Sequence, residues 1–128
     1  MKKILAVLAV ALVATVTQAA ESSDISIADL KAALAAKTVT VLDANGTDSW
    51  QAGHIPGAID FATQTAKLAS LLPQDKGALV VAYCGGPKCG AYKSAAAAAK
   101  KLGYTNVKHL SAGISGWKKA GETVEKAN

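Results

Sequence analysis

The chain has 128 residues, of which 51% are hydrophobic and 18% are charged, and its formal net charge is +5 at pH 7. These values are typical of a single compact domain and exclude two large ones. All 14 basic side chains are lysines, so the bidentate contacts that arginine makes with phosphate groups and guanine edges are absent. We therefore expect no nucleic-acid ligand.

The N-terminal segment has the parts of a secretory signal peptide. Two lysines precede an uncharged apolar stretch over residues 4–16, and small or polar residues follow it. The stretch is shorter than the roughly 20 apolar residues with which a helix crosses a bilayer. Small side chains favour cleavage after Ala19, which predicts a signal peptide at 1–19 and a folded domain at 20–128. We expect the mature domain to be periplasmic or secreted, with no stable membrane anchor.

The first elements of the mature chain follow from its apolar spacing. Residues 20–24 are polar and are expected to form a short tail. Apolar residues at helical spacing predict a helix over 27–34, with Ser26 at its N-terminus. A β-branched run predicts a strand over 38–42 that ends at Asp43. A junction between strand and loop is therefore expected at this aspartate.

The rest of the chain continues this alternation of strands and helices. The pattern predicts, in order, a helix over 47–51, a turn at 54–57, a strand over 58–61, a helix over 65–72, a strand over 78–83, a helix over 91–102, a strand over 106–110 and a final helix over about 114–119. We therefore expect an α/β sandwich with a mostly parallel central sheet flanked by helices. Ligands bind at the C-terminal ends of the strands in such sheets, and Cys84 is expected at such an end.

The two cysteines, Cys84 and Cys89, stand five positions apart in the segment YCGGPKCG. Export would place them in an oxidising compartment. A disulfide across so short a loop restricts the unfolded chain comparatively little, so the pattern favours a reactive pair over a structural one. A zinc site needs about four ligands, and the other candidates, His54 and His109, are isolated in the sequence. We expect no metal.

The segment after Cys84 is suited to holding an anion. A cysteine that ends a buried strand and precedes a glycine-rich loop and a helix lies near backbone N–H groups and the positive end of the helix dipole. This environment favours the thiolate, which is the nucleophilic form. Gly85 and Gly86 permit the loop to curl around the sulfur, although they also suit a plain turn. Pro87 stiffens the loop, and Lys88 offers a positive charge to a small anionic substrate or to solvent.

Four segments resemble the pattern of the rhodanese family in the same order. They are VTVLDANG at 39–46, GHIPGAIDF at 53–61, VVAYCGGPKCG at 80–90 and LGYTNVKHLSAGISGW at 102–117. The resemblance implies a rhodanese-like three-layer sandwich and the activity of a sulfurtransferase, with no cofactor. In such an enzyme Cys84 would take a sulfur from thiosulfate or a similar anionic donor as a persulfide. It would then pass the sulfur to a thiophilic acceptor, such as cyanide or a thiol.

The resemblance also implies roles for the neighbouring residues. The loop residues expected to bind the substrate and the persulfide are Gly85, Gly86, Pro87, Lys88, Cys89, Gly90 and Ala91. Asp43 is expected to fix the neighbouring loops by hydrogen bonds, although it also suits an ordinary strand end. His54 is expected to bond the backbone and to support its turn, without a part in catalysis.

The chain departs from the family at two points. Many active members carry arginine in or after the loop, whereas this chain has none, so Lys88 would have to replace it. The second cysteine, Cys89, suits a thiol that resolves a persulfide or sulfenate on Cys84, a partner in a reversible disulfide, or a bystander. The alternative function is a thiol-disulfide or sulfur-carrier module that uses both cysteines and a partner protein thiol with little turnover. An inactive domain used only for interaction is a third possibility.

Overall fold

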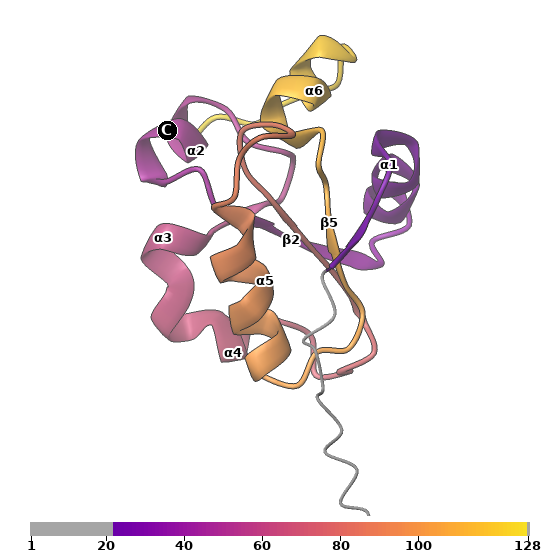
Figure 1. Cartoon of the computed structure of the whole chain (residues 1–128), viewed down its shortest axis with the longest axis vertical. Helices are drawn as coiled ribbons and strands as arrows, with labels where there is room; N and C mark the ends of the chain where they lie inside the picture. The colour runs from indigo at the N-terminus through magenta and orange to yellow at the C-terminus, as the bar shows by residue number, and fades with distance from the viewer. Residues whose placement is uncertain (1–21, 128) are drawn as a thin grey trace, which may run out of the picture.

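The computed structural model describes residues 22–127 and contains a five-stranded sheet in which all paired strands are parallel (Figure 1). The strand order is β1-β5-β4-β2-β3. The strands are β1 (Ser23–Asp24), β2 (Val39–Asp43), β3 (Ile59–Asp60), β4 (Leu79–Tyr83) and β5 (Val107–His109). The predicted signal peptide at 1–19 lies outside the described residues.

Helices cover both faces of the sheet. They are α1 (Ile27–Ala35), α2 (Thr47–Ala52), α3 (Phe61–Gln64), the 3₁₀ turn η1 (Thr65–Lys67), α4 (Leu68–Leu71), α5 (Tyr92–Lys101) and α6 (Gly113–Lys119). One core joins α4 and α5 to alternate residues of β4, including Val80 and Ala82, and the other joins α1 and α6 to Val81 and Tyr83. The expected three-layer α/β sandwich is therefore confirmed. Within residues 22–127, no helix is long and apolar enough to cross a membrane.

Two stretches differ from the elements expected from the sequence. The expected N-terminal tail ends in β1, whose residues pair with β5, and the Asp24 carboxylate accepts hydrogen bonds from the Ser111 N–H (2.8 Å) and hydroxyl (2.9 Å). The helix expected at 65–72 is replaced by three short turns that begin at Phe61. The Asp60 carboxylate caps the first turn through the Ala62 N–H at 3.1 Å, and this cap ends the strand early.

A buried tyrosine connects the C-terminal ends of the two central strands. Tyr83, the last residue of β4, is fully buried and donates its hydroxyl proton to the Asp43 carboxylate at the end of β2. The same hydroxyl accepts a hydrogen bond from the Ile55 N–H at 3.0 Å. Burial raises the pKa of Tyr83, and the neighbouring Asp43 raises it further. The hydroxyl therefore remains a donor at physiological pH and holds the two strand ends and the turn after α2 together.

Tyr83→Phe tests this connection, because the substitution keeps the ring and removes the hydroxyl. It leaves the Ile55 N–H and one Asp43 oxygen without their partner, so we expect the free energy of unfolding to fall by about 2–4 kcal/mol. Urea denaturation measures the change. Tyr92→Phe is the matched control, because no hydrogen bond of the Tyr92 hydroxyl is found within residues 22–127, and it should cost less than about 0.5 kcal/mol. Equal losses in the two variants would contradict the assigned role.

Candidate functional site

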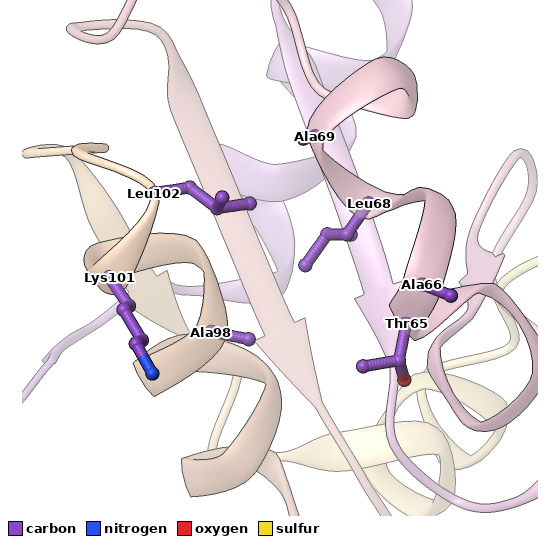
Figure 2. A pocket seen from close by; sticks show the side chains of 7 residues that line it. All are labelled: Thr65, Ala66, Leu68, Ala69, Ala98, Lys101 and Leu102. Carbon is purple, nitrogen blue, oxygen red and sulfur yellow. The ribbon is translucent and has the colours of Figure 1, made fainter.

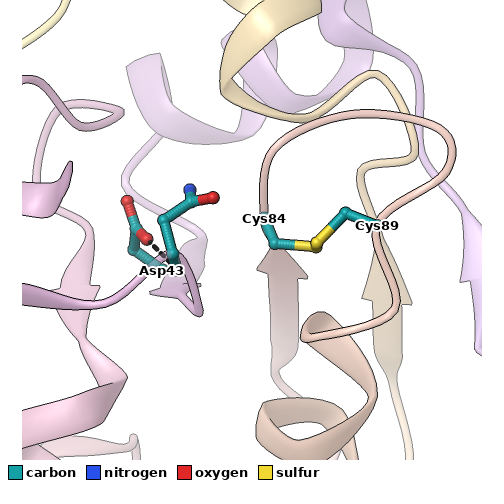
Figure 3. Close-up of a disulfide and its surroundings, with 4 residues drawn as sticks. Asp43, Cys84 and Cys89 are labelled. Carbon is teal, nitrogen blue, oxygen red and sulfur yellow. Dashed lines mark hydrogen bonds between the residues drawn. A yellow bond between two sulfur atoms is a disulfide. The ribbon is translucent and has the colours of Figure 1, made fainter.

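Cys84 directly follows β4, and its side chain is bonded to Cys89 in a disulfide (Figure 3). The two Cα atoms are 6.2 Å apart, and Cys84 is only 1% exposed. In this oxidised form Cys84 is therefore neither accessible nor a thiolate, unlike the exposed anion expected from the sequence. The difference arises because the loop folds back over the strand end and brings Cys89 onto the sulfur of Cys84.

The first part of the loop is anchored on the N-terminus of α6. The Cys84 carbonyl accepts a hydrogen bond from the Ile114 N–H at 2.9 Å, and the Gly85 carbonyl accepts one from the Ser115 N–H at 3.0 Å. Gly113 has φ +61°, and a Cβ atom there would lie 2.7 Å from the Cys84 carbonyl oxygen and 2.5 Å from the Gly86 nitrogen. Only glycine permits this close approach of the helix to the loop backbone.

The loop also contains N–H groups that have no backbone acceptor within the described residues. The Cys89 N–H donates to the Gly86 carbonyl at 3.0 Å. Among residues 22–127, the N–H groups of Gly85, Lys88 and Gly90 donate to no backbone carbonyl. The following helix α5 begins without a side-chain cap, and the Lys93 and Ser94 N–H groups of its first turn donate to the Gly90 and Ala91 carbonyls, which leaves the Tyr92 N–H as its donor without a backbone acceptor in the described part of the chain. These donors and the helix dipole favour negative charge beside the cysteines.

A shallow pocket of about 320 Å³ lies at this loop. It is lined by Gly85, Gly86, Pro87, Lys88, Cys89 and Ser115. The expected substrate-binding residues 85–89 thus share one pocket, whereas Gly90 and Ala91 do not line it. Ser115 was not predicted as a site residue, because nothing in the segment at 102–117 indicates that it lines the same pocket as Lys88. The positively charged Lys88 and one cysteine of the disulfide line the same pocket, which suits a small anion.

A second pocket, of about 370 Å³, lies between α5 and the turns from η1 to α4 (Figure 2). Its lining residues are Thr65, Ala66, Leu68, Ala69, Ala98, Lys101 and Leu102. Apolar side chains dominate the lining, and it contains no thiol, carboxylate or imidazole. The pocket at Cys84 therefore remains the candidate site.

Asp43 borders the candidate site from the neighbouring strand (Figure 3). Its carboxylate is 1% exposed, accepts the Asn45 N–H at 2.7 Å and receives the Tyr83 hydroxyl. Burial raises the pKa of Asp43, although its hydrogen bonds to Tyr83 and Asn45 oppose the shift. The Asn45 side-chain oxygen would lie 3.8 Å from a Cβ atom at Gly85, so the loop that Asp43 holds in place packs beside the cysteine loop.

His54 lies in a buried contact with the C-terminal segment and does not line the Cys84 pocket. Its Nδ1 is 2.6 Å from the Trp50 carbonyl oxygen, and its ring stacks on the Trp50 ring with 4.2 Å between centroids. The backbones of His54 and Glu125 exchange two hydrogen bonds of 2.9 Å. Glu125 also accepts the Gly57 N–H, and the Ala127 N–H reaches the Gln51 carbonyl. These contacts attach the end of the chain to the turn at 54–57.

His109 is also buried, at 8% exposure, and stacks on Tyr92, with 3.3 Å between ring centroids. Its Nε2 has no hydrogen-bond partner within residues 22–127. Burial lowers the pKa of His109, so the neutral ring is favoured. No group of three or more His, Cys, Asp or Glu side chains that could hold a metal ion is found in the described part of the chain.

The comparisons with known proteins agree with this architecture. The model of the rhodanese-like domain family matches residues 26–120. The HTH-type transcriptional regulator Rv0324 of Mycobacterium tuberculosis is 39% identical over 88 residues, which are 68% of this chain and 38% of the regulator. The chain thus spans well under half of that relative.

Two solved structures are similar over most of this chain. The BH2092 protein from Bacillus halodurans has a TM-score of 0.64 and 29% identity, with 82% of this chain and 77% of that one covered. Thiosulfate sulfurtransferase from Pseudomonas aeruginosa has a TM-score of 0.64 and 26% identity, with 84% of this chain and 21% of that one covered. The similarity thus extends to one part of a longer sulfurtransferase.

Gly113→Ala tests the contact between α6 and the cysteine loop. The new Cβ atom would overlap the loop backbone at a positive φ, so we expect the free energy of unfolding to fall by about 2–5 kcal/mol. Urea denaturation of the oxidised protein measures it. Gly57→Ala is the matched control, since Gly57 has φ +77° but nothing within 4 Å of its Cβ position. It should cost about 1 kcal/mol from the backbone conformation alone, and an equal loss at Gly113 would disprove the close contact.

Proposed function

Because this chain belongs to the rhodanese-like domain family, we propose that it is a sulfurtransferase that carries sulfur as a persulfide on Cys84. The observation that supports the proposal most strongly is the position of Cys84 directly after the C-terminal end of β4, before a glycine-rich loop that contains N–H groups without a backbone acceptor and leads into α5. This is where a parallel sheet binds its ligands. A persulfide is an anion, and such donors stabilise it without a general base.

The reaction begins with reduction of the disulfide, because the Cys84 sulfur is otherwise bonded to Cys89. The Cys84 thiolate then attacks the outer sulfur of thiosulfate, the sulfur–sulfur bond of the donor breaks, and sulfite leaves with the electron pair. A thiophile such as cyanide attacks the outer sulfur of the resulting persulfide. The product thiocyanate leaves, and the Cys84 thiolate is restored.

Lys88 is the residue that we propose for donor recognition. It is exposed at the tip of the loop, and it is the only charged side chain that lines the Cys84 pocket. Its ammonium group would attract the sulfonate end of thiosulfate, and the Ser115 side chain lies at the same pocket. A flexible ammonium replaces the planar, bidentate arginine fork only in part, so we propose weak binding of thiosulfate.

Export to the periplasm or the medium is part of the proposal. It rests on the sequence of residues 1–19, which has the order of charged, apolar and small residues typical of a signal peptide. If the chain is exported as proposed, the oxidising compartment would favour the disulfide between Cys84 and Cys89. A thiol reductant would then be needed at the same location.

A thiol-disulfide or sulfur-carrier module is the second candidate function. The disulfide itself favours it, because the two cysteines already form the oxidised half of a dithiol couple. The absence of arginine from the chain favours it as well, since a carrier that receives the outer sulfur of a persulfide on a partner protein's thiol needs no binding site for thiosulfate. The two candidates differ in whether the chain alone turns over a small donor.

Intact-mass measurement tests the persulfide. After reduction and removal of the reductant, incubation with thiosulfate should add about 32 Da, the mass of one sulfur atom, to the Cys89→Ser variant, in which no second thiol can remove the sulfur. Peptide mapping should place the added sulfur on Cys84. Cys84→Ser is the control and should remain unmodified. If neither thiosulfate nor polysulfide produces an adduct on Cys84, the sulfurtransferase proposal is wrong.

Lys88→Ala tests the recognition of the donor. Removing the only charge at the pocket should raise the KM for thiosulfate by about three- to tenfold and leave kcat nearly unchanged, and the effect should shrink at high salt. Steady-state thiocyanate formation measures both constants. Lys119→Ala provides the control, because it removes the same charge from the far end of α6, outside the pocket. Equal KM values for the two variants would exclude Lys88 as the binding residue.

A further inference from the structure

Cys89 is held beside Cys84 by the backbone of the loop. The Cα atoms are 6.2 Å apart, which is within the range of natural disulfides. The Cys89 N–H donates to the Gly86 carbonyl and closes a turn, while the N-terminus of α6 fixes the Cys84 carbonyl. The loop fold that supports the disulfide would therefore also keep a reduced Cys89 thiol close to the sulfur of Cys84.

We propose that Cys89 discharges the Cys84 persulfide and releases hydrosulfide. This inference rests on the proposed function, because it needs sulfur on Cys84. The Cys89 thiolate attacks the inner sulfur, which is the Sγ atom of Cys84. The Cys84–Cys89 disulfide forms, the bond to the outer sulfur breaks, and the outer sulfur leaves as hydrosulfide with the electron pair. The thiol proton of Cys89 is given up to solvent or to the leaving hydrosulfide.

The disulfide in the structure is the product of this step. The two thiol sulfurs are oxidised together by two electrons, and the sulfane sulfur is reduced to hydrosulfide, so the electrons balance without an external oxidant. The chain would then turn a bound sulfane sulfur into free hydrosulfide once per cycle. An external thiophile at high concentration would compete with Cys89, because it attacks the outer sulfur of the same persulfide.

Completion of the cycle requires a dithiol reductant, and the burial of the two sulfurs indicates where it attacks. Cys84 is 1% exposed, whereas Cys89 is partly exposed in the open pocket. A reductant thiolate would therefore form a mixed disulfide with Cys89 and displace the Cys84 thiolate. The second thiol of the reductant then frees Cys89 and oxidises the reductant. A reaction that transfers two electrons from a dithiol to the Cys84–Cys89 disulfide must therefore regenerate the reduced protein.

The experiment follows the fate of the bound sulfur without any acceptor. Reduced wild-type protein and Cys89→Ser are incubated with thiosulfate under anaerobic conditions, hydrosulfide is measured during the incubation with a fluorogenic probe, and the protein is then desalted for mass measurement. The wild-type protein should release about one hydrosulfide per persulfide and end about 2 Da below the mass of its reduced form. Cys89→Ser should keep the added sulfur on Cys84 and release hydrosulfide at least about tenfold more slowly, because it lacks the adjacent thiol.

Two controls keep the outcomes distinct. Ala97→Ser introduces a hydroxyl at an exposed position of α5 and should release hydrosulfide like the wild type. Cys89→Ala repeats the main test with a different side chain, and thermal unfolding of both Cys89 variants confirms that they are folded. Protein is kept dilute, and non-reducing electrophoresis detects disulfides between chains.

Each outcome decides a different statement. If Cys89→Ser takes up sulfur and releases hydrosulfide at the wild-type rate, the role of Cys89 is wrong and the sulfurtransferase proposal stands. Retention of the persulfide by the wild type, or release only through disulfides between chains, overturns the role of Cys89 in the same way. If no variant with Cys84 takes up sulfur from any donor, the proposed function falls and this step falls with it.

Discussion

The contact between the cysteine loop and the N-terminus of α6 determines the geometry of the candidate site. Two N–H groups of the helix bond the carbonyl groups of Cys84 and Gly85, and Gly113 lies so close to the loop that no side chain fits between them. The loop after β4 therefore starts from a fixed backbone. Several of its remaining N–H groups have no backbone acceptor among residues 22–127. The geometry of the sulfur pair depends on this contact more than on the cysteines themselves.

The second support of the site is the buried pair of Asp43 and Tyr83. Tyr83 is the residue before Cys84, so a displacement of the tyrosine backbone directly displaces the cysteine. Its hydroxyl joins β2, β4 and the turn after α2, all within the described core. A carboxylate so deeply buried is costly without donors, and Tyr83 and Asn45 provide them. The polar residues at this edge thus stabilise the loops beside the cysteine pair.

Much of the fold is predictable from local patterns, and several features of the site are not. The apolar run at 78–83 predicts β4 because a central parallel strand must be buried on both faces. In contrast, β1 is invisible to such reasoning, because Ser23 and Asp24 are polar and exposed and pair only through their backbone. Asp60, which ends β3, also accepts the hydroxyl of Thr47 in α2. Contacts between distant segments carry no local signal.

The same limit applies to the candidate site. Cys84 is recognisable from the strand before it and the glycines after it, and the resemblance to rhodaneses supplies its possible chemistry. The contact of Gly113 with the loop cannot be predicted from the sequence, since a glycine at the start of a helix is compatible with many roles. Likewise, a spacing of five positions between two cysteines is compatible with two free thiols and with a disulfide. Only the path of the loop shows that Cys89 reaches Cys84.

The attachment of the chain end to the turn at 54–57 has a consequence for how the molecule is made. Gln51, His54 and Gly57 each form a hydrogen bond with Ala127 or Glu125, so these contacts form only after nearly all of the described sequence has been synthesised. A ribosome-bound fragment that lacks these residues would hold the histidine turn open. The contacts between this turn and the chain end therefore join an early segment of the sequence to a late one, and they complete the packing of the turn last.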